Sequence, residues 1–212
     1  MKEIEAALSA YERLRSRQYQ ITVPELETSF RLKLLPAHFH HLLGFQHLTD
    51  LPDIALCPKG AHRFYHLLKN GAYREETFRK SVHYPAIEER VCSFSRLEQI
   101  LSASDTRLII DFDPTKASSE IEARFILFER RGDPRAGEPV TYYNFFIGYN
   151  DDQGCYYPAT FVVEHSRKYQ SEQRYYDCTI EELPLEAGRK KRRKAAAGEG
   201  AGPSEAPEDA AP

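Results

Sequence analysis

The spacing of hydrophobic residues changes about halfway along the chain. In the first half, apolar residues recur at helical intervals, as in Ile4, Tyr11 and Leu14, with Glu and Arg on the opposite face. From about residue 107 onward, the spacing is typical of strands, in which side chains alternate between two faces. The first pattern predicts helices at residues 2–17, 37–43, 60–70, 74–81 and 86–103.

Strand-like runs in the second half are separated by turn sequences such as Asn150–Gly154. Such short connections indicate antiparallel neighbours. The run 142–147 is apolar on both faces, which predicts a central strand covered by the helices. The predicted strands are residues 107–113, 121–131, 140–149, 155–164 and 174–181, and two short strands at 19–23 and 29–34 are expected to pair with each other. The predicted fold class is α+β, a helical N-terminal half packed on a four- to five-stranded antiparallel meander.

Composition divides the chain into a body and a tail. We expect residues 1–184 to form one domain. Residues 185–212 begin with a basic run, Arg189–Lys194, and continue in Ala, Gly, Glu and Pro without an apolar face, so we expect this tail to be disordered. The tail carries +1 of the net charge of −3, which leaves −4 on the body. A body of this charge gives no general support for nucleic-acid binding, so RNA would need a local basic patch.

The clearest basic cluster of the body comprises Arg167, Lys168 and Arg174, and the run in the tail is a second candidate for contact with RNA or an acidic partner. No window approaches the roughly 18 apolar residues of a membrane helix, and the N-terminus lacks the pattern of a signal peptide. We therefore expect a cytoplasmic protein with no membrane partner. The four cysteines form no C-x-x-C pair, which favours free thiols.

Histidines are concentrated in the front half of the chain. On a helical wheel, Phe39 and Leu42 lie on the buried face of the predicted helix, His40 lies at the edge of that face, and His41 lies on the far side. Histidine changes charge near neutral pH and therefore suits proton transfer or metal ligation. The six histidines concerned are His38, His40, His41, His47, His62 and His66.

His62 and His66 are spaced to share one helix face, which could hold a metal ion. The glutamate of the zinc-protease motif is missing between them, and no third ligand has a telling spacing, so a metal-dependent hydrolase is a distant alternative. The usual phosphate-binding, dinucleotide-binding and serine-hydrolase motifs are absent from the sequence. We therefore expect no cofactor.

Two motifs together resemble a known family. Phe39-x-His41-Leu42-Leu43-Gly44 follows two short strands, and Pro158-x-Thr160-Phe161 lies in a later strand upstream of Tyr169. This arrangement resembles the barnase–EndoU–colicin–RelE-like nucleases, in their fourth phage-type subgroup, over about residues 10–182. The resemblance implies a compact sheet with helices on one side and a metal-independent endoribonuclease from a phage or mobile element.

In such an enzyme, a base takes the proton of the RNA 2′-hydroxyl, a cation or hydrogen-bond donors stabilise the phosphorane, and an acid protonates the leaving 5′-oxygen. By motif position, the resemblance implies that His41 is the acid or base and that Thr160 places a hydroxyl at the phosphate. His165, Tyr169 and Arg124 are further catalytic candidates, chosen for their chemistry and expected position.

The implied partners are RNA, free or in the form of tRNA or the ribosome, and an antitoxin or immunity protein. The alternative is a catalytically inactive protein- or RNA-binding module on the same fold.

Overall fold

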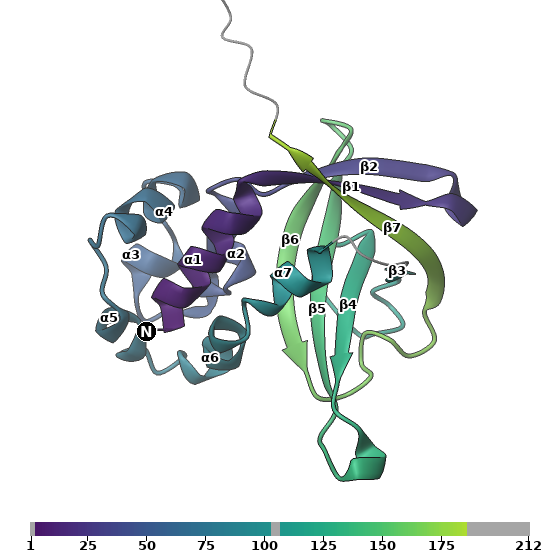
Figure 1. Ribbon diagram of the computed structural model, residues 1–212. Coiled ribbons are helices and arrows are strands. Elements are labelled where there is room, and N and C mark those ends of the chain that lie inside the picture. The colour runs from purple at the N-terminus through teal and green to yellow at the C-terminus, as the bar shows by residue number, and fades with distance from the viewer. Residues whose placement is uncertain (1–2, 103–106, 186–212) are drawn as a thin grey trace, which may run out of the picture.

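The computed structural model describes residues 3–102 and 107–185, and the helices occupy the first half of the chain (Figure 1). Apart from Leu185, the predicted tail with its basic run lies outside the described residues. The helices are α1 (Glu3–Arg15), α2 (His38–Leu42), α3 (Pro52–Ala55), α4 (Ala61–Lys69), α5 (Glu75–Arg79), α6 (Pro85–Cys92) and α7 (Arg96–Leu101), with short 3-10 helices η1 (Pro24–Leu26), η2 (Phe45–His47) and η3 (Pro134–Ala136).

The described strands form one antiparallel sheet in the order β2-β1-β7-β3-β4-β5-β6. Their bounds are β1 (Arg17–Val23), β2 (Thr28–Lys33), β3 (Arg107–Asp111), β4 (Phe125–Arg131), β5 (Thr141–Asn150), β6 (Cys155–Glu164) and β7 (Arg174–Pro184). The α+β class is confirmed, but the predicted sheet of four or five strands is wrong, because the sheet has seven.

β7 is the reason for the larger sheet. It is long enough to pair with β3 along its first half and with β1 along its second half, so the early β1–β2 hairpin joins the later strands. Only β3 to β6 form the predicted meander, and β7 returns to β3 instead of pairing with β6. Sequence spacing shows that β1 and β2 can pair, but it does not show which distant strand will extend their hairpin.

The sheet curls, so that strands distant in the sheet order approach one another (Figure 1). Phe30 of β2 stacks on Tyr156 of β6, with ring centroids 3.9 Å apart, although these strands are at opposite edges. Phe30 also stacks on Phe125 of β4 at 5.6 Å. Stacked aromatic rings therefore fill the inside of the curl at this end.

Each face of the sheet has its own hydrophobic core. Phe145 and Ile147 of β5 pack toward the helices, where Phe39, Phe94 and Phe161 also lie. Phe146 faces the opposite side and belongs to a smaller cluster that includes Ile110, Phe112, Ile126 and Tyr169. β5 is thus central and apolar on both faces, as predicted, but one face is covered by connecting segments rather than by helices.

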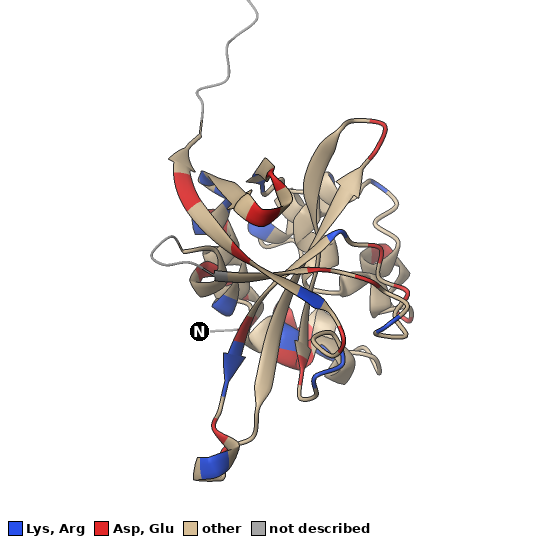
Figure 2. Ribbon diagram, turned by 90° about the vertical axis from the view of Figure 1, so that its right-hand side faces the viewer, with Lys and Arg blue, Asp and Glu red and all other residues tan. Residues whose placement is uncertain are grey.

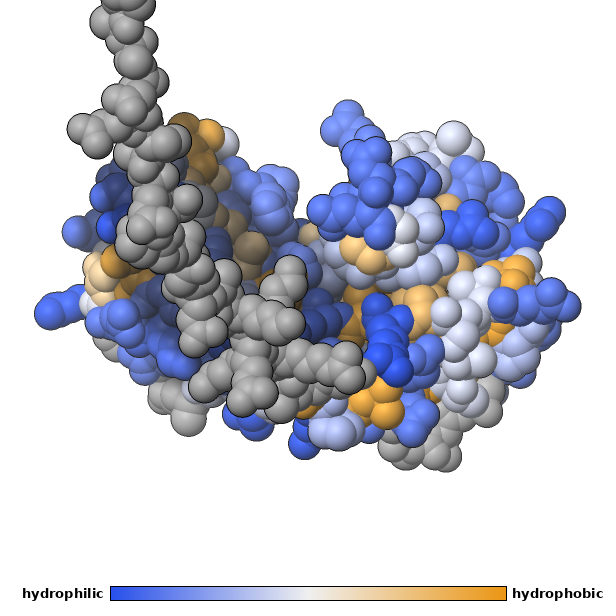
Figure 3. Space-filling view, turned by 90° about the horizontal axis from the view of Figure 1, so that it is seen from above, coloured by the Kyte–Doolittle hydropathy of each residue, from blue (hydrophilic) through white to orange (hydrophobic). Residues whose placement is uncertain are grey.

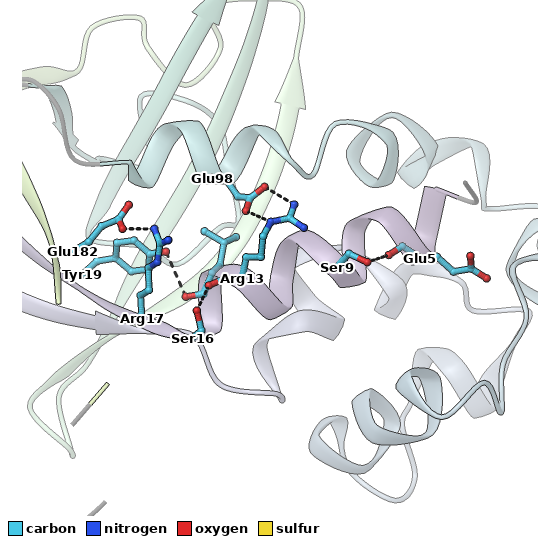
Figure 4. A network of polar contacts seen from close by, with 9 residues as sticks. Glu5, Ser9, Arg13, Ser16, Arg17, Tyr19, Glu98 and Glu182 are labelled. Atoms are coloured by element: carbon cyan, nitrogen blue, oxygen red, sulfur yellow. Dashed lines mark hydrogen bonds and ion pairs between the residues drawn. The ribbon is translucent and has the colours of Figure 1, made fainter. Parts of the chain in front are cut away.

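Polar contacts tie α1 and β1 to later parts of the chain (Figure 4). Arg13 of α1 makes a two-pronged ion pair with Glu98 of α7, at 2.7 and 2.8 Å. Arg17, at the start of β1, pairs with Glu182 of β7. Such exposed pairs contribute roughly 0–1 kcal/mol each, so they orient the N-terminal helix more than they stabilise it.

The helix predicted at 86–103 is two helices, α6 and α7, with a break at residues 93–95. Ser93 and Ser95 flank Phe94, and serine is a weak helix former because its side chain competes for backbone hydrogen bonds. Phe94 is fully buried, with its ring 5.8 Å from Phe161 and 6.0 Å from Phe39. The chain bends between α6 and α7 so that this ring is buried between the sheet and the helices, and the periodic pattern of the sequence does not show the bend.

The surface carries mixed charge. Basic and acidic segments are scattered over a ribbon that is mostly of other residues, with basic residues at the end of β4 (Figure 2). Seen from above, apolar residues are interspersed with polar ones (Figure 3). Within the described ranges, none of the helices has the length and apolar character needed to cross a membrane.

Candidate functional site

The predicted histidine helix and the predicted threonine strand meet at the edge of the sheet. α2 packs against β6, and the Thr160 hydroxyl lies 3.5 Å from the His41 carbonyl oxygen, to which it donates. The side chain of His41 is exposed and Phe39 and Leu42 of the same helix are buried, as the helical wheel predicts, whereas His40, expected at the edge of that face, is buried. His41 is therefore available to a substrate next to Thr160.

The Pro158-x-Thr160 motif forms a β-bulge. Phe146 pairs with Thr160, but the next residue of β5, Ile147, pairs with Pro158, so Ala159 is an extra residue in β6. Bulges redirect side chains and are common next to active sites. β6 is an edge strand, which tolerates proline because one side needs no N–H donor.

Arg90 of α6 reaches the same junction. A Cβ atom on Gly44 would lie 2.5 Å from Nη1 of Arg90, so the guanidinium rests directly on this glycine. Gly44 also has φ +76°, a left-handed conformation that turns the chain from α2 into η2. Burial lowers the pKa of Arg90 to about 10, and the nearby Tyr169 phenol acts in the opposite direction.

The charge of Arg90 lacks a protein counterion. In the part of the chain that the structure describes, its buried Nη1 has no hydrogen-bond partner and no carboxylate forms an ion pair with it. A partly buried guanidinium without an acid is costly unless an anion approaches it. The position beside an exposed histidine and a hydroxyl therefore has the chemistry of a phosphate site.

His47 follows on η2 and completes the α2–β6 site, which we define as His41, His47, Arg90 and Thr160. Its side chain is exposed, and its pKa is lowered by partial burial and by the positive charges of Arg90 and His41. Arg90 rests on Gly44, which is three residues from both His41 and His47 along the chain, so the three groups lie around one turn of the backbone. A histidine with a lowered pKa is neutral at pH 7 and can accept a proton.

Family comparison decides the class of protein. The model of the phage-Barnase-EndoU-ColicinE5/D-RelE like nuclease4 family matches residues 3–179, which include both motifs and all of the α2–β6 site. The chain belongs to this nuclease family. No match was found among curated proteins or among solved structures. The resemblance drawn from the two motifs is thus confirmed.

The other two histidines of this region have structural roles in this nuclease-family chain. His40 is 2% exposed, and its Nε2 donates to the Ile54 carbonyl oxygen at 2.7 Å. His38 Nδ1 accepts from the backbone N–H of Leu35 at 3.2 Å, and burial lowers its pKa to about 4. Both rings are kept neutral, and the His40 ring lies edge-on to that of His41, with centroids 5.3 Å apart.

Tyr169 lies behind the α2–β6 site. It is buried in the smaller core, 5.0 Å from the ring of Phe146, and its phenol acts against the lowering of the Arg90 pKa. This burial suits a residue that positions Arg90 more than one that contacts substrate. Phe146 is also the pairing partner of Thr160, so Tyr169 is connected to both polar groups of the site.

His165 and Arg124 lie on different strands, His165 after the edge strand β6 and Arg124 before the interior strand β4. His165 follows the end of β6, roughly 16 Å along the strand from Thr160 at about 3.3 Å per residue, and its Nε2 contacts Glu89 at 3.0 Å. Arg124 precedes β4 and pairs with Asp111 at 3.3 Å. Each of these side chains therefore contacts a carboxylate rather than a member of the α2–β6 site.

The histidine pair of α4 has the predicted geometry. The rings of His62 and His66 lie side by side, with centroids 4.6 Å apart. Among the described residues, no group of three or more His, Cys, Asp and Glu side chains is arranged to hold a metal ion. His62 and His66 thus have no third ligand in this part of the chain.

Arg90 and His47 are the residues that sequence reasoning missed as site members. Arg90 is 46 residues beyond Gly44 in the sequence, in a helix with an ordinary amphipathic pattern. The available signal was the glycine itself, because a turn glycine can mark the close approach of another group as well as a positive φ. Nothing in the sequence states which group approaches.

Proposed function

We propose that this nuclease-family protein cleaves RNA without a metal ion, at the α2–β6 site and in the cytoplasm. The observation that supports it best is Arg90, a partly buried guanidinium without a carboxylate partner, seated on Gly44 beside His41, His47 and Thr160. A scissile phosphate supplies the anion that this arrangement lacks.

The reaction is an internal transfer. His47, neutral at pH 7, takes the proton of the 2′-hydroxyl as the oxygen attacks phosphorus, and His41 in its protonated form gives a proton to the departing 5′-oxygen. The 2′-oxygen–phosphorus bond forms and the bond from phosphorus to the 5′-oxygen breaks. The products are a 2′,3′-cyclic phosphate end and a 5′-hydroxyl end.

Arg90 and Thr160 act on the charge that develops between these proton transfers. The guanidinium offers paired N–H donors to two phosphate oxygens, and the hydroxyl of Thr160 can turn from the His41 carbonyl to a third. Neither side chain has to move into place, since Gly44 positions Arg90 and the β6 bulge positions Thr160. Such preorganised donors are typically worth about 10²–10³ in rate each.

The decisive experiment is cleavage of single-stranded RNA by the full chain in the presence of excess EDTA. We expect cyclic-phosphate ends from the wild type, no cleavage of a 2′-deoxy substrate, and a loss of roughly 10²–10⁴-fold in His41→Ala. His62→Ala, on the exposed pair of α4, is the matched control and retains full activity. Cleavage that requires a divalent ion, or that survives in His41→Ala, would contradict the proposal.

A second candidate is a catalytically inactive protein- or RNA-binding module, because the net charge of −4 on the body gives no general support for a nuclease. The same assay separates the two, because a binding module leaves RNA intact under every condition and retains RNA on a filter. A toxin-like enzyme also slows growth when it is expressed, and a cognate antitoxin or immunity protein would relieve this by covering Arg90 and His41.

A further inference from the structure

A second polar feature lies on the face of the sheet opposite the helices. A pocket of about 400 Å³ is lined by Phe128, Arg130, Tyr142, Arg167, Gln170 and Tyr175. Its floor comes from neighbouring strands, since Arg130 of β4 pairs with Tyr142 of β5, and Tyr175 of β7 pairs with Ile110 of β3. Its rim comes from residues 166–173, which connect β6 to β7.

A chain of amide groups at the base of this pocket ends in an unsatisfied acceptor. The Tyr142 carbonyl can only accept, so Asn144 must present its Nδ2 to it, at 3.3 Å. The Asn144 Oδ1 therefore faces Gln170 and accepts a hydrogen bond from its Nε2. This order leaves Oε1 of Gln170 as an acceptor, buried and without a partner among the described residues.

The unpaired Oε1 of Gln170 would be stabilised by an N–H donor. Gln170 is 2% exposed and Asn144 is fully buried, so the amides lose water on both sides. An unsatisfied buried polar group costs about 1–3 kcal/mol, and Gln170 lines the pocket. Oε1 itself is closed to solvent, so a ligand N–H satisfies it once the Gln170 side chain turns toward the pocket.

The pocket also carries positive charge and aromatic walls. In the described chain, neither Arg130 nor Arg167 forms an ion pair with a carboxylate, while Arg167 lies beside the Tyr175 hydroxyl. That hydroxyl donates to the Gln170 carbonyl oxygen and fixes the rim to the floor. Glu164, which pairs with Tyr142 and shares its face, accepts from the backbone N–H groups of residues 165 and 166.

The pocket lies along the same strands as the α2–β6 site, toward the His165 end of β6, because Tyr142 of its floor pairs with Glu164. Tyr169, which lies behind Arg90, is the residue before Gln170, and its ring packs on Phe146 at 5.0 Å. Phe146 pairs with Thr160 of the site, and Asn144, which hydrogen-bonds the pocket residue Gln170, is two residues away on the same face of β5. A strand of RNA crossing the edge of β6 would pass from one to the other.

We propose that this pocket binds one unpaired nucleotide of the RNA substrate, near the cleaved phosphate. The base stacks on the aromatic walls of Phe128, Tyr142 and Tyr175, and its Watson–Crick edge donates an N–H to Gln170. Arg130 and Arg167 bind the phosphate of the same nucleotide. The identity of the ligand rests on the proposed ribonuclease function. Arg167 belongs to the basic cluster noted in the sequence, and binding this phosphate would be its role.

The test measures binding of adenosine 5′-monophosphate to the full chain by calorimetry. Three probes distinguish the parts of the site: adenosine monophosphate, its N6,N6-dimethyl form, which has no N–H on the base edge, and inorganic phosphate. We expect the dimethyl form to bind about 5- to 50-fold more weakly, and inorganic phosphate to bind more weakly still because it cannot stack.

The matching variant is Arg130→Gln with Arg167→Gln, both exposed positions, compared with Arg63→Gln, an exposed arginine of α4. We expect the double variant to lose at least tenfold in affinity with an unchanged thermal midpoint, and Arg63→Gln to bind as the wild type does. Equal affinity for all three probes, or for the double variant and the wild type, would overturn the proposal.

Cleavage kinetics separate this proposal from the proposed catalytic function. The double variant should raise KM for RNA at least tenfold with little change in kcat, and His41→Ala should lower kcat and leave nucleotide binding intact. If the wild type binds the nucleotide but cleaves no RNA, the proposed catalytic function is wrong and the pocket proposal stands. Cleavage with an unchanged KM in the double variant would sink the pocket alone.

Discussion

The guanidinium of Arg90 lies on the α-carbon of Gly44, so close that a methyl group at Gly44 would reach within 2.5 Å of Nη1. The short helix α2 is followed by glycine for two reasons. The left-handed φ of +76° carries the chain into η2, and the missing side chain leaves room for the cation of α6. One residue thus couples the path of the backbone to the electrostatics of the site.

We therefore predict that Gly44→Ala impairs the site more than backbone strain alone explains. Gly71 is the matched control, because it has φ +75° and open space around the position of a Cβ atom. Both substitutions should cost about 1 kcal/mol of unfolding free energy from the positive φ. Only Gly44→Ala should also displace Arg90 and lower RNA cleavage by about 10²-fold, as chemical denaturation and initial rates would reveal. Equal effects in the two variants would mean that the Arg90 contact is unimportant.

Thr160 provides a second test, because a hydroxyl can be removed there with almost no change in shape. Thr160→Val should lower kcat by about 10–10³-fold, whereas Thr160→Ser should stay within a few-fold of the wild type. The bond to the His41 carbonyl is long, at 3.5 Å, so the free energy of unfolding should change by less than about 1 kcal/mol in either variant. A large drop in stability without a change in kcat would make Thr160 a structural residue only.

Sequence reasoning reached the parts of the site that depend on local pattern. The exposure of His41 and the burial of His40 follow from helical period, and the position of Thr160 follows from a motif in a recognisable strand. Arg90 could not be found in this way, because its place depends on how α6 docks against Gly44. The same limit explains the sheet, since nothing local to β1 indicates that Ile21 will pair with Ile180.

Acid should destabilise the protein partly through His38. Burial lowers its folded-state pKa to about 4, below the unfolded value of about 6.5. The unfolded chain therefore binds the proton first, and stability falls as pH drops from about 6.5 to about 4. His38→Asn keeps an acceptor for the Leu35 N–H and cannot titrate, so its urea midpoint should fall less between pH 7 and pH 5.

His83→Asn, at an exposed position, is the control for loss of a histidine as such. Its urea midpoint should follow the wild type across the same pH range. His40 and His47 also have lowered pKa values and remain in every variant, so His38→Asn should remove only a part of the acid sensitivity. Identical acid sensitivity in His38→Asn and the wild type would show that His38 is not held neutral in the fold.

His165 and Arg124 test whether the site is where α2 meets β6 or elsewhere along the sheet. Each has the right chemistry for RNA cleavage, but His165 contacts Glu89 at 3.0 Å and Arg124 pairs with Asp111 at 3.3 Å. A carboxylate partner offsets the positive charge that a phosphate would need, and neither residue contacts a member of the α2–β6 site. His165→Gln and Arg124→Gln should therefore retain kcat within about threefold, far from the roughly 10²–10⁴-fold loss expected for a proton-transfer residue. Single-turnover cleavage by the two variants, beside His41→Ala, decides the matter: a loss in His165→Gln equal to that in His41→Ala would move the chemistry to the far end of β6.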